Sequence, residues 1–172
     1  MLKRILVILI LLMALTGCGK KEHERKLEEE MYQAYLTYYQ ALLDTTEKAS
    51  KAQEFSTSVV VNKLDGGKYR YDLIIDEPKV AMYDVEALAI IRGESDQIST
   101  EVMMPSVGIF DDFYNMVPNQ VYKDRGYVAG VVLSLTSTEP SLKIDLIVCW
   151  QDKERTETYK RFLSFDVNAE QQ

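Results

Sequence analysis

Residues that could perform chemistry are few in this 172-residue chain. It contains one histidine, His23, and two cysteines, Cys18 and Cys149. His23 lies in a charged stretch near the N-terminus, so the rest of the chain has no histidine from which to build a Ser-His-Asp triad, a Cys-His pair or a histidine-bound zinc site. We therefore predict no catalytic centre of these kinds, no metal site and no cofactor.

An acidic pair, Asp111-Asp112, is the remaining candidate for catalysis. Two carboxylates on either side of a glycosidic bond are what glycoside hydrolysis requires, so a carboxylate-based glycan hydrolase stays open as an alternative. Asn115 lies close enough in sequence to add an oxygen for calcium, but the Asp-x-Asp-x-Asp-Gly spacing of a calcium loop is absent. Because acidic pairs are common on solvated surfaces, the main prediction is that the protein is not an enzyme.

Cys18 follows a distinctive N-terminal sequence. Lys3 and Arg4 give it a positive start, and the apolar run over residues 5–15 has the length of a signal-peptide core and is short for a membrane span. Two small residues then precede the cysteine. The sequence Leu15-Thr16-Gly17-Cys18 resembles the lipobox of bacterial lipoproteins.

The resemblance implies that residues 1–17 are a cleaved signal peptide and that Cys18 becomes the first residue of the mature protein. Its thiol would carry a diacylglyceryl group, and fatty acids such as palmitate would provide the anchor. Two or three acyl chains hold a protein firmly on a membrane, because each buried methylene contributes about 0.8 kcal/mol. We expect a lipid-anchored protein on the extracytoplasmic face of the bacterial cell membrane. Gly19 does not decide between an inner and an outer membrane.

The net charge of the chain is −7, and loss of Lys3 and Arg4 with the signal peptide makes the mature chain more acidic still. An acidic balance argues against nucleic-acid binding, which needs a basic surface. Cys149 would remain as the one unmodified cysteine, so no intrachain disulfide is expected and a hydrophobic core must stabilise the fold. The length after residue 18 suits one globular domain.

Residues 18–22 are interpreted as a lipidated tether, and residues 23–55 as a long amphipathic helix, since this stretch lacks Gly and Pro and is rich in helix-forming residues. Four tyrosines lie within two turns of that helix. One interpretation is that they pack on the globular domain or on a second copy of the helix. The other is an aromatic surface for a partner, with Tyr35 and Tyr39 as candidates.

Residues 56–172 are predicted to form an antiparallel immunoglobulin-like or fibronectin-like β-sandwich of six or seven strands, so the fold class is mainly β. The prediction depends on alternating apolar and polar residues separated by turn sequences such as Asp65-Gly66-Gly67. Both faces of residues 80–91 are apolar, which predicts a central or covered strand, and a bulge is expected near Tyr83-Asp84. The resemblance to such sandwiches is one of strand rhythm only. The expected strands cover residues 59–64, 69–76, 80–91, 127–135, 142–150 and 159–167.

One segment, residues 99–124, does not follow the strand rhythm. It combines large apolar side chains with two prolines and a glycine, and long connections of this kind either cover a core or bind a partner. Both interpretations stay open. Residues 117–122 could form an edge strand. The candidate partner-binding residues are Phe110, Phe113, Tyr114 and Met116, together with Tyr35 and Tyr39 on the helix.

The sequence thus predicts a membrane-anchored extracytoplasmic lipoprotein that acts as a noncovalent binding or accessory module of the cell envelope. The expected partner is an envelope protein or a cell-wall component. The alternatives are a structural spacer that self-associates through the helix as a homo-oligomer, and the carboxylate hydrolase.

Overall fold

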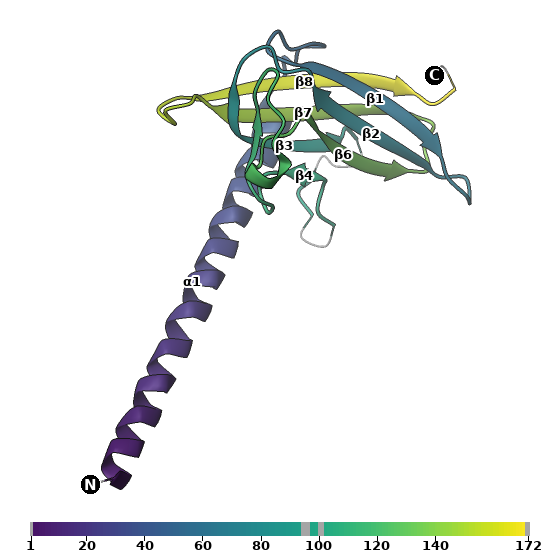
Figure 1. Cartoon of the computed structure of the whole chain (residues 1–172). Coiled ribbons are helices and arrows are strands. Elements are labelled where there is room, and N and C mark those ends of the chain that lie inside the picture. The colour runs from purple at the N-terminus through teal and green to yellow at the C-terminus, as the bar shows by residue number, and fades with distance from the viewer. Residues whose placement is uncertain (1, 94–96, 100–101, 171–172) are drawn as a thin grey trace.

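The computed structural model describes residues 2–93, 97–99 and 102–170, with side chains from residue 22 onward. The fold is mainly β, with two antiparallel sheets and one long helix, α1 (Leu2–Asp44) (Figure 1). The three-stranded sheet has the order β1-β2-β6. Its strands are β1 (Ser56–Lys63), β2 (Tyr69–Asp76) and β6 (Gly130–Ser137).

The five-stranded sheet has the order β4-β3-β7-β8, and β5 pairs with β3 beside this path. Its long strands are β3 (Met82–Ile91), β7 (Ser141–Gln151) and β8 (Thr158–Asn168). Its short strands are β4 (Ser106–Val107) and β5 (Tyr114–Met116). The six predicted strand regions correspond to the six long strands. The predicted irregularity in β3 is confirmed, since its pairing with β7 shifts register between Tyr83 and Glu86.

The main hydrophobic core lies between the two sheets. Alternate residues of β2, among them Leu73 and Ile75, are fully buried and face β7 residues such as Leu146 and Val148. This alternation follows from the pleat, which directs successive side chains of a strand to opposite faces. Trp150 of β7 is 3% exposed and contributes to this cluster.

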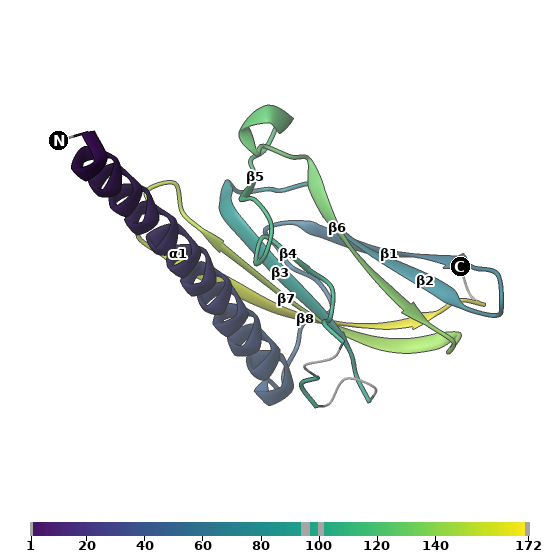
Figure 2. The ribbon, with the colours of Figure 1, turned by 90° about the horizontal axis from the view of Figure 1, so that it is seen from below.

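The other face of the five-stranded sheet is covered by α1, so the body has three layers: helix, five-stranded sheet and three-stranded sheet (Figure 2). Tyr35, Tyr39 and Leu42 of α1 are buried against Leu88 and Ile147, among others. This layer explains why β3 and β7 are apolar on both faces, and it is the cover predicted for residues 80–91. In the absence of the helix these apolar side chains would face water.

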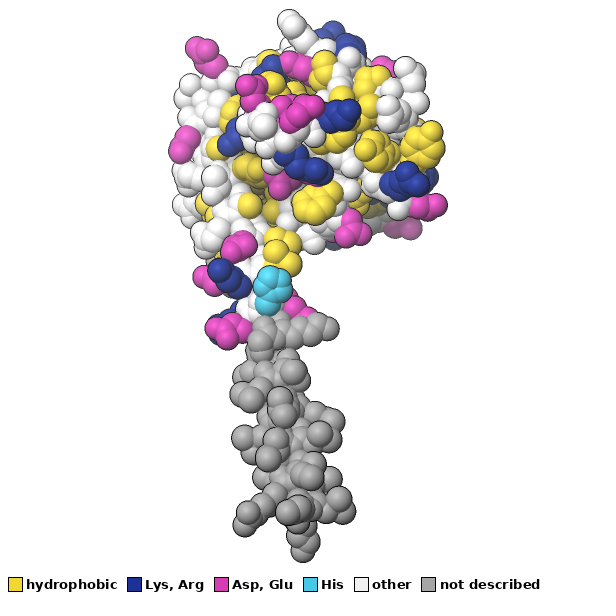
Figure 3. Space-filling model, turned by 60° about the vertical axis from the view of Figure 1, so that its left-hand side comes forward, with side chains coloured by type: hydrophobic (Ala, Val, Ile, Leu, Met, Phe, Trp, Pro, Cys, Tyr) yellow, Lys and Arg dark blue, Asp and Glu magenta, His cyan; other side chains and the backbone are white. Residues whose placement is uncertain are grey.

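The part of α1 that extends away from the body is exposed and charged. All residues from 22 to 30 are exposed, and burial begins at Met31. Figure 1 shows the helix leaving the body at this point, and Figure 3 shows acidic and basic side chains around it directly below the body. Over the part of the chain that the structure describes, no helix is long and apolar enough to cross a membrane.

The helix ends at Asp44 rather than near Phe55 as predicted from composition. Residues 45–55 are irregular because their backbone is used elsewhere: Ala49 N–H donates to Phe162 O (3.0 Å) and Ser164 N–H donates to Ala49 O (2.9 Å). These hydrogen bonds attach the chain to the edge of β8. Helix propensity is worth only tenths of a kcal/mol per residue, so tertiary hydrogen bonds can override it.

Candidate functional site

Residues 102–129 form an irregular cap at one end of the body, and much of its apolar surface is exposed. Half of the large apolar side chains that are exposed in the described part of the chain belong to segment 99–124. They are Val102, Met103, Phe110, Phe113, Val121 and Tyr122. Exposed large apolar side chains concentrated in one segment of a small body often indicate an interaction site.

A buried asparagine positions this cap. Asn115 is 9% exposed, and its Oδ1 accepts a hydrogen bond from Asp84 N–H (3.1 Å), which lies in the irregular part of β3. Its backbone pairs with the far arm of the cap, since Asn115 N–H donates to Gly126 O (2.7 Å) and Val128 N–H donates to Asn115 O (3.0 Å). The amide therefore joins three segments that are distant in sequence.

The irregular conformation of β3 is further stabilised by an ion pair. Asp84 has a positive φ of 47°, and its carboxylate accepts hydrogen bonds from the Arg155 guanidinium, with Nη2 at 3.2 Å from Oδ1. Arg155 lies in the turn between β7 and β8. The pair is exposed on the arginine side, so its contribution to stability is small.

The predicted binding residues of the cap occupy different environments. Met116 is fully buried and Tyr114 is half-buried against the main core, both within β5. The Phe110 ring is 36% exposed and lies 5.7 Å from the Tyr35 ring. Phe113 is 68% exposed. Of these four residues, the structure therefore presents Phe113 most fully to a partner.

The two predicted helix residues are core residues of the helix–sheet layer. Tyr35 and Tyr39 are at most 1% exposed, and their rings lie 5.9 Å apart. Tyr35 Oη accepts a hydrogen bond from Met104 N–H (2.9 Å), so the helix attaches the start of the cap. The environment of both tyrosines thus matches the interpretation that they pack on the body.

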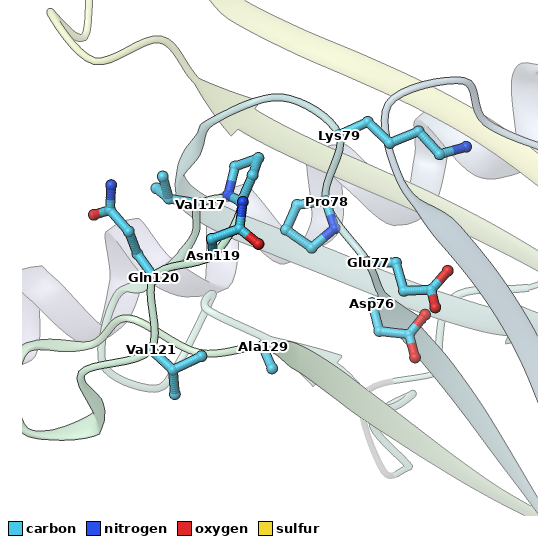
Figure 4. Close-up of a pocket in the computed structure, with 10 residues that line it drawn as sticks. Asp76, Glu77, Pro78, Lys79, Val117, Asn119, Gln120, Val121 and Ala129 are labelled. Atoms are coloured by element: carbon cyan, nitrogen blue, oxygen red, sulfur yellow. The ribbon is translucent and has the colours of Figure 1, made fainter.

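A groove of about 650 Å³ lies beside the cap (Figure 4). Its two walls are the turn over residues 76–79 and the turn over residues 117–121, with Ala129 at the base. Pro78 and Pro118 give the walls apolar surface, whereas Asp76, Glu77 and Lys79 add charge to one wall. Residues 117–122 form no strand in the structure, because Gln120 N–H bonds back to Val117 O (3.1 Å) in a turn.

Sequence reasoning did not identify the wall at residues 76–79. Glu77 has a positive φ of 46°, and its carboxylate accepts a hydrogen bond from Ser56 Oγ (2.9 Å). The one local signal is the proline at position 78, which indicates a turn. Only tertiary structure brings that turn opposite Val117 and Val121.

A partly buried polar cluster lies beside Phe113. The Tyr38 hydroxyl donates a hydrogen bond to Glu86 Oε2, and Cys149 is 1% exposed beside them. Burial raises the pKa of Glu86 and of Tyr38, and raises the pKa of the Cys149 thiol to about 12. Since only a thiolate is a strong nucleophile, Cys149 has the character of a small core residue at neutral pH.

The acidic pair lies on the surface of the cap. Asp111 and Asp112 are exposed, and no group of three or more His, Cys, Asp or Glu residues within the described ranges is arranged to hold a metal ion. The arrangement of the cap and groove suits noncovalent contact with a partner, through exposed apolar side chains on a supported backbone. Comparison of the chain with protein-family models, curated proteins and solved structures found no match.

Proposed function

We propose that this protein is a lipid-anchored bacterial lipoprotein whose β body binds an envelope protein or a cell-wall component through the cap and the adjacent groove. The observation on which this proposal depends is the concentration of exposed large apolar side chains in segment 99–124, with Phe113, Val121 and Tyr122 each at least half exposed. Aromatic residues at the centre of an interface contribute a large share of binding energy. Asn115 and β5 support these residues, so less entropy is lost on binding than for a free loop.

The proposed anchor is the diacylglyceryl group on Cys18. α1 links this position to the body, and residues 22–30 between them are exposed. At a rise of about 1.5 Å per residue, the helix from residue 18 to residue 31 would separate the lipid from the body by about 20 Å. That distance would keep the cap and groove clear of the headgroups.

We further infer that the two sheets form an immunoglobulin-like sandwich and that α1 is an amphipathic helix. An immunoglobulin-like sandwich is supported by the core between two antiparallel sheets. An amphipathic helix is supported by the contrast, within the same turns, between the buried Tyr35, Tyr39 and Leu42 and the exposed Gln33, Thr37, Gln40 and Asp44.

The self-associating spacer has less support. The apolar side of the helix around Tyr35, Tyr39 and Leu42 already packs on the five-stranded sheet and is not available to a second copy. The carboxylate hydrolase also has less support, because Asp111 and Asp112 are exposed and neither lines the groove.

Site-specific photocrosslinking in intact cells tests the binding role. A photoreactive residue at position 113 or 121 should give the same discrete crosslinked product, and Tyr122→Ala should reduce its yield. Position 60, which is also exposed but lies on β1, is the matched control. Identical products from positions 60 and 113, or none from position 113, would contradict the proposal.

The anchor is tested separately by Cys18→Ala. The variant should remain unprocessed or appear in the soluble fraction, because Cys18 is the cysteine that follows the lipobox-like sequence. Cys149→Ala is the control and should behave as the parent does in this assay. A Cys18→Ala variant that still sediments with membranes at the mature size would exclude lipidation at this position.

A further inference from the structure

A second pocket, which shares no lining residue with the cap or the groove, lies at the C-terminal end of α1 on the helix-covered face of the five-stranded sheet. It has a volume of about 370 Å³, and its lining includes Lys48, Arg92, Lys143, Asp145 and Ser164. Three cationic side chains thus surround one carboxylate. An excess of positive charge at one place is notable in a chain with a net charge of −7.

Asp145 is fully buried, and its two oxygens differ. Oδ2 pairs with Lys48 Nζ at 3.2 Å and with an N–H of the Arg92 guanidinium. Oδ1 receives no hydrogen bond from any residue that the structure describes. A buried carboxylate oxygen without a donor is costly, and such groups in native proteins usually have a partner.

Other polar groups in this pocket also have capacity to bind. Ser164 Oγ is buried and has no hydrogen-bond partner within the described residues. Lys143 is exposed and forms no ion pair with a described residue. The contact of Arg92 with Asp145 uses Nη2, and a guanidinium has five N–H donors in total.

A ligand that satisfies all these groups must be an anion that also donates a hydrogen bond. Its negative oxygens would meet Lys143, Arg92 and the Ser164 hydroxyl, and its own O–H would donate to Asp145 Oδ1. Inorganic phosphate retains such an O–H at neutral pH, because its hydrogen phosphate form still carries a proton. A phosphate monoester retains one only as the monoanion, which predominates below its second pKa of about 6, whereas sulfate and phosphate diesters have none. We propose that this pocket binds a phosphate group that retains one hydroxyl, either as the free ion or at the end of a monoester.

Binding to the full chain can be measured by calorimetry at constant ionic strength with inorganic phosphate, methyl phosphate, dimethyl phosphate and sulfate. A pH of about 5.5 keeps most of the methyl phosphate as the monoanion that carries an O–H. Inorganic phosphate should bind saturably at millimolar concentration or below, and sulfate and dimethyl phosphate should bind at least about tenfold more weakly, since they leave Oδ1 unpaired. Comparable binding of methyl phosphate would identify a monoester as the ligand form. Binding of inorganic phosphate alone would identify the free ion.

Lys143→Gln removes one cation from an exposed position and should raise the Kd for phosphate about tenfold, the usual effect of losing one charge-assisted hydrogen bond. Lys63→Gln, on β1, is the matched control and should leave the Kd unchanged. Ser164→Ala should weaken binding without loss of folding, and avoids the unpaired cations that Asp145→Asn would create. Equal affinity for sulfate and phosphate, no saturable phosphate binding, or equal effects of Lys143→Gln and Lys63→Gln would overturn the proposal.

Discussion

At the scale of single residues, Glu86 combines burial with a hydrogen bond from Tyr38. Burial raises the pKa of this carboxyl above its ordinary value of 4.5, because desolvation disfavours the charged form. The folded state therefore binds this proton more tightly than the unfolded state does. The contribution of Glu86 to stability is most favourable below pH 4.5 and declines as the pH rises through the folded-state pKa.

Glu86→Gln should therefore raise the melting temperature at pH 7 and leave it nearly unchanged near pH 4, where the wild-type carboxyl is protonated. The amide oxygen can still accept the hydrogen bond from Tyr38. Thermal melts of both proteins between these pH values check the prediction. Glu28→Gln, on the exposed part of α1, is the control and should show no such divergence; a constant difference at all pH values would argue against the titration of Glu86 as the cause.

Met116 and Phe113 are neighbours in the cap with opposite environments, at 0% and 68% exposed. Met116→Ala should lower the free energy of unfolding by about 2 to 5 kcal/mol, the usual cost of truncating a buried large side chain. Phe113→Ala should leave it nearly unchanged and instead lower the yield of the crosslinked product obtained from position 121. Denaturant unfolding with crosslinking checks both. Destabilisation by Phe113→Ala as large as that by Met116→Ala would make the cap a core cover alone.

At the scale of elements, β4 and β3 approach each other closely at Gly108. This glycine has a φ of 75°, and a Cβ atom added to it would lie 2.1 Å from Val85 O, so both the conformation and the space require glycine. Gly66, in the turn after β1, has a similar φ of 77°, but an added Cβ would meet no atom within 4 Å. Alanine substitutions at Gly66 and Gly108 therefore separate the effect of the backbone conformation on stability from the effect of the steric overlap.

Gly66→Ala should destabilise the protein by about 1 kcal/mol, from the left-handed conformation alone. Gly108→Ala should cost several times more, because Val85 O belongs to the backbone of β3 and cannot move without disturbing the sheet. Denaturant midpoints of the two variants provide the comparison. Equal losses of stability in the two variants would show that the β3–β4 contact is easily rearranged.

At the scale of the whole molecule, the helix has two parts with different roles. Residues from Met31 onward cover the five-stranded sheet, whereas residues 22–30 are exposed. A chain that begins at Met31 should therefore melt at nearly the same temperature as one that begins at Lys21. A chain that begins at Ser56 should be much less stable and prone to association, because Leu88, Ile90 and Ile147 lose their cover.

Thermal melts and sizing of the three chains test this division. Equal melting temperatures for chains beginning at Lys21 and Ser56 would show that the helix contributes no packing energy. A much lower melting temperature for the chain that begins at Met31 would show that residues 21–30 stabilise the body, which is not expected of exposed residues.

Local pattern was sufficient for most of the β body. The six long strands, the turn at Gly66-Gly67 and the irregularity of β3 follow from alternation and turn residues, which are properties of a few neighbouring residues. Because β3 has apolar residues on both of its faces, the sequence also predicted that another element covers this strand. The short strands β4 and β5 were not predicted, because each is held by pairing with β3 rather than by its own sequence.

The sequence by itself determined the strand pattern, the presence of a helix before the strands, the acidic charge and the lipobox-like sequence at Cys18, because each is encoded in residues that are close along the chain. Only the tertiary structure decided that the helix stops at Asp44, that Tyr35 and Tyr39 are buried while Phe113 is exposed, and that residues 76–79 face residues 117–121 across a groove. It also brought Lys48, Arg92 and Lys143 around Asp145. These arrangements depend on contacts between residues far apart in sequence, and their energies exceed the local preferences that a sequence pattern reports.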